Sequence, residues 1–133
     1  MPNYLELFNA IRQRPGMFLS DEKYEEAAAL VFGYDLACEG GVLAGFQEWL
    51  VMKLGKGANQ HWSALVCNIA FPHETDPQEA ARATKDTNRL AIETLFNLIA
   101  EFDNIRRASR EGLKDIFVAF DRWLIDNERR IDD

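Results

Sequence analysis

Apolar residues recur every three or four positions along most of the chain, and this spacing gathers them on one face of an α-helix. Glycine, proline and short polar stretches separate the periodic segments. The pattern predicts helices over about residues 4–13, 21–39, 43–54, 62–71, 77–103 and 109–124. The expected fold is therefore all-α, an irregular bundle of five to six helices that forms a single domain over residues 1–133.

Three local signals set the expected helix boundaries. The Arg14-Pro15-Gly16 turn ends the first helix, because proline disfavours helix before it and glycine permits a turn. Ser20 is placed to cap the second helix. Asp76-Pro77-Gln78-Glu79 resembles a capping box with proline at the first helical position, and it predicts a helix that continues to about Asp103. We expect the polar first half of that helix, Ala80–Asn88, to project beyond the core.

The segment from Trp62 to Phe71 admits two interpretations, a short helix or a buried strand. Helix is favoured, because a single strand would have no partner elsewhere in the sequence.

Composition points to a globular protein that folds without cross-links. Hydrophobic residues make up 47% of the 133 residues and charged residues 28%. Cys38 and Cys67 lie in apolar runs, and no CxxC pair or Cys/His cluster is present, so we expect no zinc site and no cofactor. The start of the chain lacks the features of a signal peptide, and no apolar stretch approaches the length of a membrane span. Cytoplasmic localisation follows as an expectation.

Negative charge is concentrated in one part of the chain. The net charge is −7, and residues 16–55 hold seven acids against two lysines. Such a field repels nucleic acid and anionic membranes and favours a basic protein partner. An alternative remains open, in which the excess of acids only keeps the protein soluble.

The second predicted helix carries the candidate binding residues. Its apolar positions gather on one side, whereas Phe32 lies among acids on the other. Either Phe32 packs under a neighbouring helix, or it is an aromatic anchor inside an acidic patch, as a hot spot for a basic partner requires. The candidate partner-binding residues are Asp21, Glu22, Glu25, Glu26, Phe32, Asp35 and Glu39.

The segment Ile11–Leu19, which contains Arg14-Pro15-Gly16-Met17, resembles the RPGMYIG segment of the ATPase domain of gyrase B and type IV topoisomerases. In that family the next helix supplies a catalytic glutamate and, a few residues later, a metal-binding asparagine. Here that helix contains Glu25 and Glu26, but alanine and leucine stand four residues after them, and the glycine-rich nucleotide lid is missing. We therefore interpret this resemblance as coincidental and expect no enzymatic activity.

A second resemblance is carried by the segments Arg14–Ser20, Gly45–Leu50, His61-Trp62 and Leu95–Phe102. They make the chain similar to small bacterial immunity-type proteins, which are encoded beside secreted toxins. The similarity spans about residues 4–103 and departs at Ser20, where glycine is usual. It implies a protein that neutralises a cognate toxin by direct binding, with no chemistry of its own.

Other candidate sites carry weaker signals. A pocket lined by Trp49, Trp62 and Trp123 would suit a small-molecule-binding or regulatory domain, and we keep this as the alternative function. The two histidines, His61 and His73, are expected to be exposed at helix ends. No nucleophile signature surrounds the serines or cysteines. The Arg106-Arg107-x-x-Arg110 cluster is expected to be a solvated connector, because it has too few basic residues for a nucleic-acid-binding patch and acids lie nearby.

Overall fold

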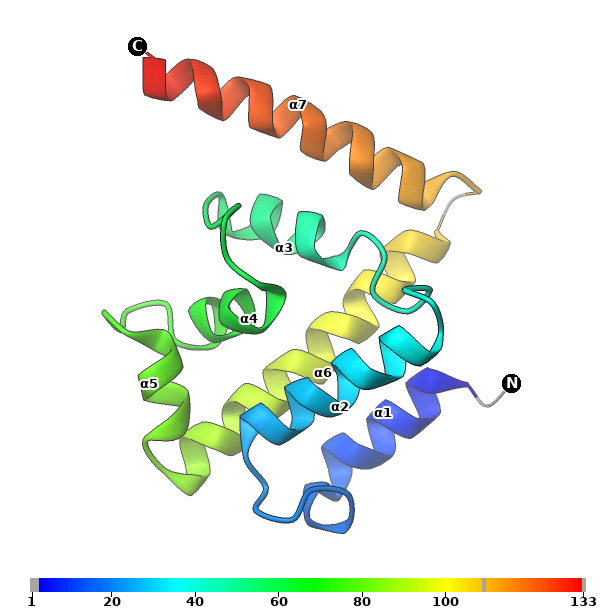
Figure 1. Ribbon diagram of the computed structural model, residues 1–133, viewed down its shortest axis with the longest axis vertical. Coiled ribbons are helices and arrows are strands. Elements are labelled where there is room, and N and C mark those ends of the chain that lie inside the picture. Colours follow the sequence, from blue (N-terminus) through cyan, green and yellow to red (C-terminus); the bar gives the residue numbers. More distant parts are fainter. Residues whose placement is uncertain (1–2, 109, 133) are drawn as a thin grey trace.

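The computed structural model describes residues 3–108 and 110–132, with the side chains described through residue 127. The described residues form seven α-helices and no strand, so the all-α prediction is confirmed and the expected number of helices is close. A 3-10 turn, η1 (Pro15–Met17), follows the first helix. The helices are α1 (Tyr4–Gln13), α2 (Tyr24–Ala37), α3 (Phe46–Leu54), α4 (Trp62–Ala70), α5 (Pro77–Arg82), α6 (Lys85–Arg107) and α7 (Gly112–Asp132) (Figure 1).

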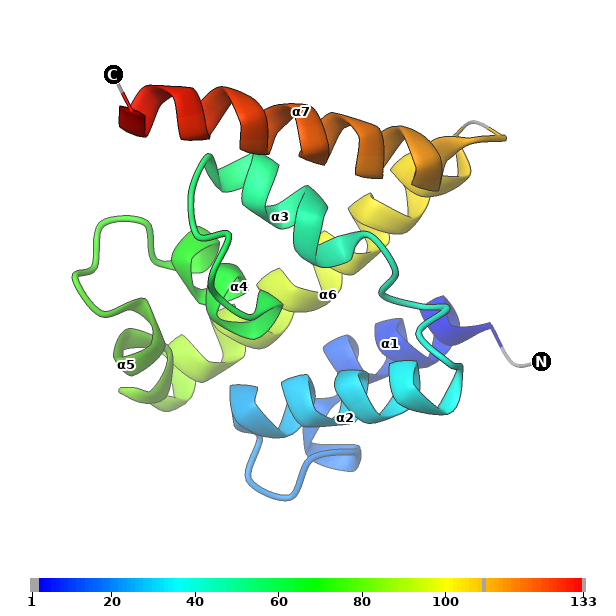
Figure 2. The ribbon, with the colours of Figure 1, turned by 45° about the horizontal axis from the view of Figure 1, so that its top comes forward.

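Helix α6 is the centre of the bundle. It contacts each of the other six α-helices. Helices α1 and α2 lie along one side of it and α3, α4 and α5 along the other, whereas α7 crosses over α3 (Figures 1 and 2). The inward side of α6 includes Leu95, Leu98, Ile99 and Phe102, each no more than 5% exposed, as their spacing of three and four residues predicts.

The helix expected over residues 77–103 is in fact two helices. The Asp76 cap is present, since Asp76 Oδ1 accepts a hydrogen bond from the Glu79 N–H at 3.1 Å. A second cap at Thr84 then starts α6: the Thr84 hydroxyl oxygen accepts from the Thr87 N–H, and the Thr87 hydroxyl oxygen accepts from the Thr84 N–H. The prediction that residues 80–88 project beyond the core is wrong, because Ala81 and Asn88 are buried.

Helix α2 begins later than the sequence suggests. Lys23 occupies the N-cap position, and the Ser20 hydroxyl contacts the Glu26 carboxylate instead of a helix N–H, so the predicted Ser20 cap is wrong. The buried amide of Asn88 accepts a hydrogen bond from the Tyr24 N–H at 2.9 Å and donates one to the Thr84 carbonyl. This side chain therefore fixes the first turn of α2 on the start of α6.

The segment from Trp62 to Phe71, for which a strand was the alternative, forms helix α4 (Trp62–Ala70), so the strand alternative is wrong. His61 caps it by accepting a hydrogen bond from the Ser63 N–H. Trp62 is 5% exposed and packs against Phe46 in the core, with ring centroids 6.0 Å apart and an interplanar angle of 59°. Leu65 and Val66 follow it into the same core cluster.

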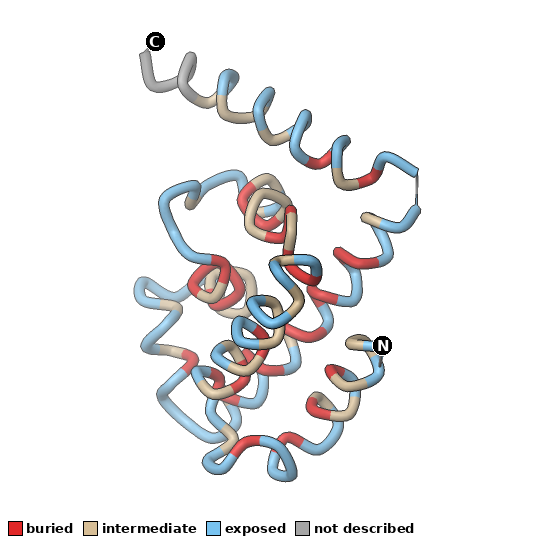
Figure 3. The backbone as a smooth tube through the Cα atoms, turned by 45° about the vertical axis from the view of Figure 1, so that its right-hand side comes forward, coloured by how far each residue is buried: buried red, intermediate tan, exposed pale blue. Residues whose placement is uncertain are grey.

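Helix α7 covers α3 with one face and leaves the other exposed. Buried and half-buried positions lie along the edge that faces the rest of the molecule, and exposed positions along the outer edge (Figure 3). The contact depends on Gly45, whose φ is +89° and whose missing side chain leaves room for Leu113. The expected first residue of this helix, Ser109, lies outside the described residues.

Candidate protein-binding surface

The outer side of α2 is apolar although it faces away from the core. Phe32 is 44% exposed and Leu36 is 61% exposed. Ala29, Gly33 and Ala37, which are also exposed, lie beside them. We call these five residues the α2 outer face. Since Tyr24, Ala27 and Val31 bury the opposite side, α2 is apolar nearly all round, a pattern typical of helices covered on both sides.

Phe32 lies at the surface and not beneath a neighbouring helix. Its ring contacts the His61 ring at the start of α4, with centroids 5.8 Å apart and an interplanar angle of 75°. Partial burial lowers the pKa of His61, so its ring is favoured in the neutral form. This contact holds one edge of Phe32 in place while much of the ring stays accessible.

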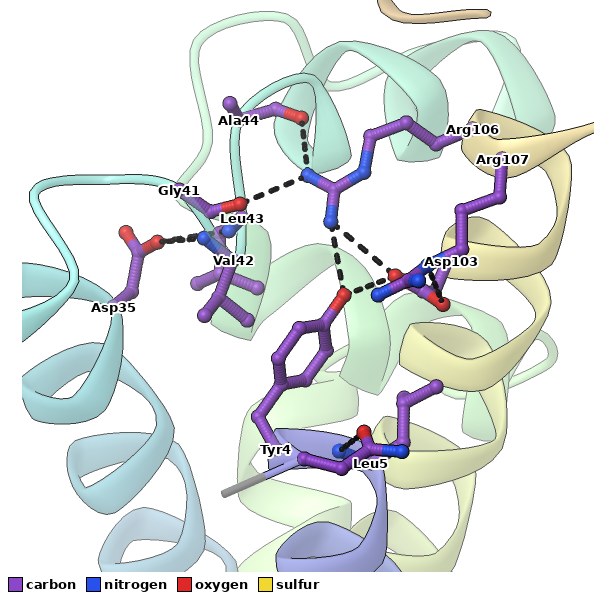
Figure 4. Close-up of polar contacts among 11 residues, drawn as sticks. Tyr4, Leu5, Asp35, Gly41, Val42, Leu43, Ala44, Asp103, Arg106 and Arg107 are labelled. Carbon is purple, nitrogen blue, oxygen red and sulfur yellow. Dashed lines mark hydrogen bonds and ion pairs between the residues drawn. The ribbon is translucent and has the colours of Figure 1, made fainter. Parts of the chain in front are cut away.

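Two of the acids predicted to bind a partner accept hydrogen bonds from backbone N–H groups of the chain itself. Glu26 Oε1 accepts hydrogen bonds from the backbone N–H groups of Asp21 and Lys23, both at 3.0 Å. The bond from Lys23, followed by the one from the Ser20 hydroxyl, lowers the pKa of Glu26. Asp35 Oδ1 accepts from the N–H groups of the two residues that follow the α2 turn, at 3.1 and 2.8 Å (Figure 4).

Two further acids have basic neighbours. The Glu25 carboxylate accepts a hydrogen bond from Arg82 Nε, which raises the pKa of that guanidinium. Glu22 Oε2 lies 3.8 Å from Lys85 Nζ. The Arg82–Glu25 pair is solvent-exposed, and in the second pair Lys85 is exposed and Glu22 half-buried, so each contributes little to stability.

The remaining two acids stand at the ends of α2. Asp21 is exposed three residues before the helix begins, and Glu39 is exposed two residues after it ends. Within residues 21–39 there are six acids and a single base, Lys23. Even with Arg82 and Lys85 included, the surroundings of the α2 outer face carry a formal charge of −3. The structure thus places acidic groups at both ends of an exposed apolar helix face.

Arg106 and Arg107, in the last turn of α6, belong to a partly buried polar network and are not a solvated connector. Arg106 Nη1 donates to the carbonyl oxygens of Gly41 and Ala44, and its Nη2 donates to the Tyr4 hydroxyl oxygen at 3.0 Å (Figure 4). Arg107 Nε lies 2.8 Å from Asp103 Oδ2. The network ties the α2–α3 connection and the start of α1 to the end of α6.

The tryptophans serve packing. Trp62 is in the core, Trp49 packs against Phe102 with ring centroids 5.7 Å apart, and Trp123 stacks on Phe120. Two cavities of about 530 and 220 Å³ lie beside α4, and other residues line them. The smaller one is lined by Tyr24, Glu25, Ala28, Ser63, Cys67, Gln78 and Arg82.

In the part of the chain that the structure describes, the metal-ligating side chains do not form a cluster. His61 and His73 are both exposed, as expected, and the His61 ring contacts Phe32 and Ser63. Within the described residues, no group of three or more His, Cys, Asp or Glu side chains is placed to hold a metal ion. Over the same part of the chain, none of the helices has both the length and the apolar character that crossing a bilayer requires.

Sequence reasoning found Phe32 but missed the rest of the apolar face. Leu36 stands four residues after Phe32, and Ala29, Gly33 and Ala37 follow each other at the same interval, which is the spacing of a single helical strip. This periodicity was the available signal.

Comparison with known proteins gives no family: no family model matches the chain, and neither a curated protein nor a solved structure matches it significantly.

Proposed function

We propose that this chain is an immunity-type protein that binds a basic protein toxin in the cytoplasm and inhibits it by direct contact. The observation that carries the proposal is the α2 outer face, an exposed apolar strip with acidic groups at both ends. The expected resemblance of residues 4–103 to immunity-type proteins is the reason for proposing a toxin as the partner.

An apolar centre with a charged surround is the arrangement expected of a protein-binding hot spot. Apolar side chains such as Phe32 and Leu36 supply affinity when a partner removes them from water. The surrounding acids increase the rate of encounter with a basic protein and disfavour acidic ones. A nuclease toxin would fit this field, because its basic site binds phosphates and carboxylates can take their place.

The test is binding and inhibition with the toxin domain encoded by the neighbouring open reading frame. We expect a one-to-one complex by light scattering, loss of toxin activity on mixing, and an association rate that falls as salt rises. The double variant Asp21→Lys/Glu39→Lys should associate more slowly, because it reverses the negative charges at the two ends of the α2 outer face. It should remain folded, because both side chains are exposed. Asp121→Lys/Asp126→Lys on α7 makes the same charge change at exposed positions and is the matched control. Absence of a complex, or a complex that leaves the toxin active, would refute the proposal.

A further inference from the structure

Gly33 is a residue that the fold itself does not need. It lies within α2, has no positive φ, and a Cβ built on it meets nothing within 4 Å. Glycine inside a helix is less favourable than alanine, because it loses more backbone freedom on folding. The chain therefore carries a destabilising residue at an exposed position where any small side chain would fit.

Two parallel strips on α2 give the face a shape. Phe32 and Leu36 form a raised strip, and Ala29, Gly33 and Ala37 form a low strip beside it, each with a spacing of four residues. Rows at this spacing are the ridges and grooves by which helices pack against each other. A groove floored by glycine and alanine allows another backbone to approach more closely than larger side chains would permit.

Charge decides which kind of helix fits there. In a second copy of this chain, two-fold pairing about Gly33 would bring two acidic surroundings together, and like charges across an interface are unfavourable. A basic helix has the opposite relation, because Asp21 and Glu39 stand free of fold contacts at the two ends of the face. The acidic balance of residues 21–39 therefore favours a basic occupant over a second copy.

We propose that the α2 outer face receives an amphipathic α-helix of the basic partner, which crosses α2 closely at Gly33. This inference rests on the proposed function for the partner being a protein. The partner's apolar residues contact Phe32 and Leu36, and its lysine or arginine residues lie near Asp21 and Glu39. Gly33 then determines specificity, since only a small residue there leaves room for the crossing.

Synthetic helical peptides provide the probes. The first has leucine and alanine along one helical face and lysine elsewhere; the second replaces lysine with glutamate; the third scrambles the first so that the apolar face is lost. We measure each by fluorescence anisotropy against the wild-type chain and against Gly33→Leu. Ala119→Leu, which adds the same side chain at an exposed position of α7, is the control.

We expect the first peptide to bind wild type at least about tenfold more tightly than the other two, which corresponds to about 1.4 kcal/mol. Gly33→Leu should weaken that binding about tenfold or more, whereas Ala119→Leu should change it less than about twofold. Gly33→Leu should melt no lower than wild type, because leucine favours helix and the position is open. Its effect on binding is therefore not a loss of fold.

Equal binding of the first peptide by wild type and a folded Gly33→Leu variant would overturn the inference. A concentration-dependent dimer of the wild type that Gly33→Leu abolishes would also overturn it, by assigning the face to a second copy. The proposed function is judged separately with the toxin. Toxin inhibition that Gly33→Leu leaves unchanged would support the proposed function and refute the helix-binding mode. Peptide binding that depends on Gly33, in a chain that binds no toxin, would support the surface and refute the toxin as its partner.

Discussion

The hydroxyl of Tyr4 donates a hydrogen bond to Asp103, ninety-nine positions along the chain, and so joins the first turn of α1 to the end of α6. Asp103 is only 3% exposed, and burial alone would raise its pKa. The hydrogen bonds from Tyr4 and Arg107, together with the guanidinium charges, outweigh burial and lower the pKa below its usual value. The ionised carboxylate is therefore the form that the folded protein favours.

A pH titration of stability tests this network. Because the pKa of Asp103 is lower in the folded chain than in the unfolded one, its contribution is complete well above about pH 4 and is lost as the pH falls below that value. Asp103→Asn should cost about 2 kcal/mol at pH 7. It should also show a smaller further loss than wild type between pH 5 and pH 2, measured by urea unfolding. Parallel curves for the two proteins would contradict the assignment.

Asp35 and Glu39 should behave differently on substitution, although both belong to the acidic segment. Asp35→Ala leaves two backbone N–H groups without their carboxylate acceptor, so we expect a loss of about 1–2 kcal/mol. Glu39→Ala removes an exposed side chain and should change stability by less than about 0.5 kcal/mol. Chemical unfolding of both variants makes the comparison. Equal losses would mean that Asp35 does not hold the α2–α3 connection.

Gly45 should tolerate no side chain. Its φ of +89° is strained for an L-residue, and a Cβ there would lie 2.7 Å from Leu113 Cδ1. Gly45→Ala should therefore destabilise the protein by at least about 1–2 kcal/mol and loosen α7 from α3. Hydrogen exchange of α7 is the measurement that separates local loosening from global loss. Gly33→Ala is the matched control and should instead raise stability by about 0.5–1 kcal/mol.

The two cysteines should differ in reactivity. Cys67 is 1% exposed, and burial raises its pKa to about 11, so little thiolate is present near neutral pH. Cys38 is half-buried at the end of α2. A disulfide reagent should label Cys38 in the native protein and Cys67 only as the chain unfolds, which mass spectrometry of digested samples can follow. Rapid native labelling of Cys67 would show that the cavity beside it opens readily.

Periodicity was sufficient for the helices, but boundaries depended on contacts that periodicity does not encode. The Asp76 cap was visible because its side chain acts within its own turn. The break before Lys85 was missed, since Thr84 and Thr87 cap each other without an acid or a proline to mark them. The position of Ser20 predicts a cap, but the Glu26 carboxylate accepts the hydrogen bonds from the N–H groups of Asp21 and Lys23 instead.

The surface was predictable in part for the same reason. Sequence placed Phe32 among acids, and exposure of its ring depends on where α4 lies, which no local pattern specifies. Charge counts treated all the acids alike. The structure separates Glu26 and Asp35, which bind backbone N–H groups, from Asp21 and Glu39, which are exposed at the ends of α2.

Phe32→Ala tests the proposed surface most directly. Because the ring is 44% exposed and contacts the His61 ring at its edge, its loss should cost about 1 kcal/mol of stability or less, in contrast to about 3–5 kcal/mol for a buried phenylalanine. Binding of the cognate toxin should weaken by about 2 kcal/mol, or about thirtyfold, mainly through faster dissociation.

Phe117→Ala on α7 is the control for that experiment, since Phe117 is 39% exposed and lies outside the acidic segment. We expect a similar small change in melting temperature and an unchanged toxin affinity. Thirtyfold weaker binding by Phe32→Ala alone would assign Phe32 to the interface, because both variants remove an aromatic ring of comparable exposure. Equal weakening by both variants would move the interface toward α7 or attribute the effect to stability. Unchanged affinity of both would exclude the α2 outer face as the toxin-binding surface.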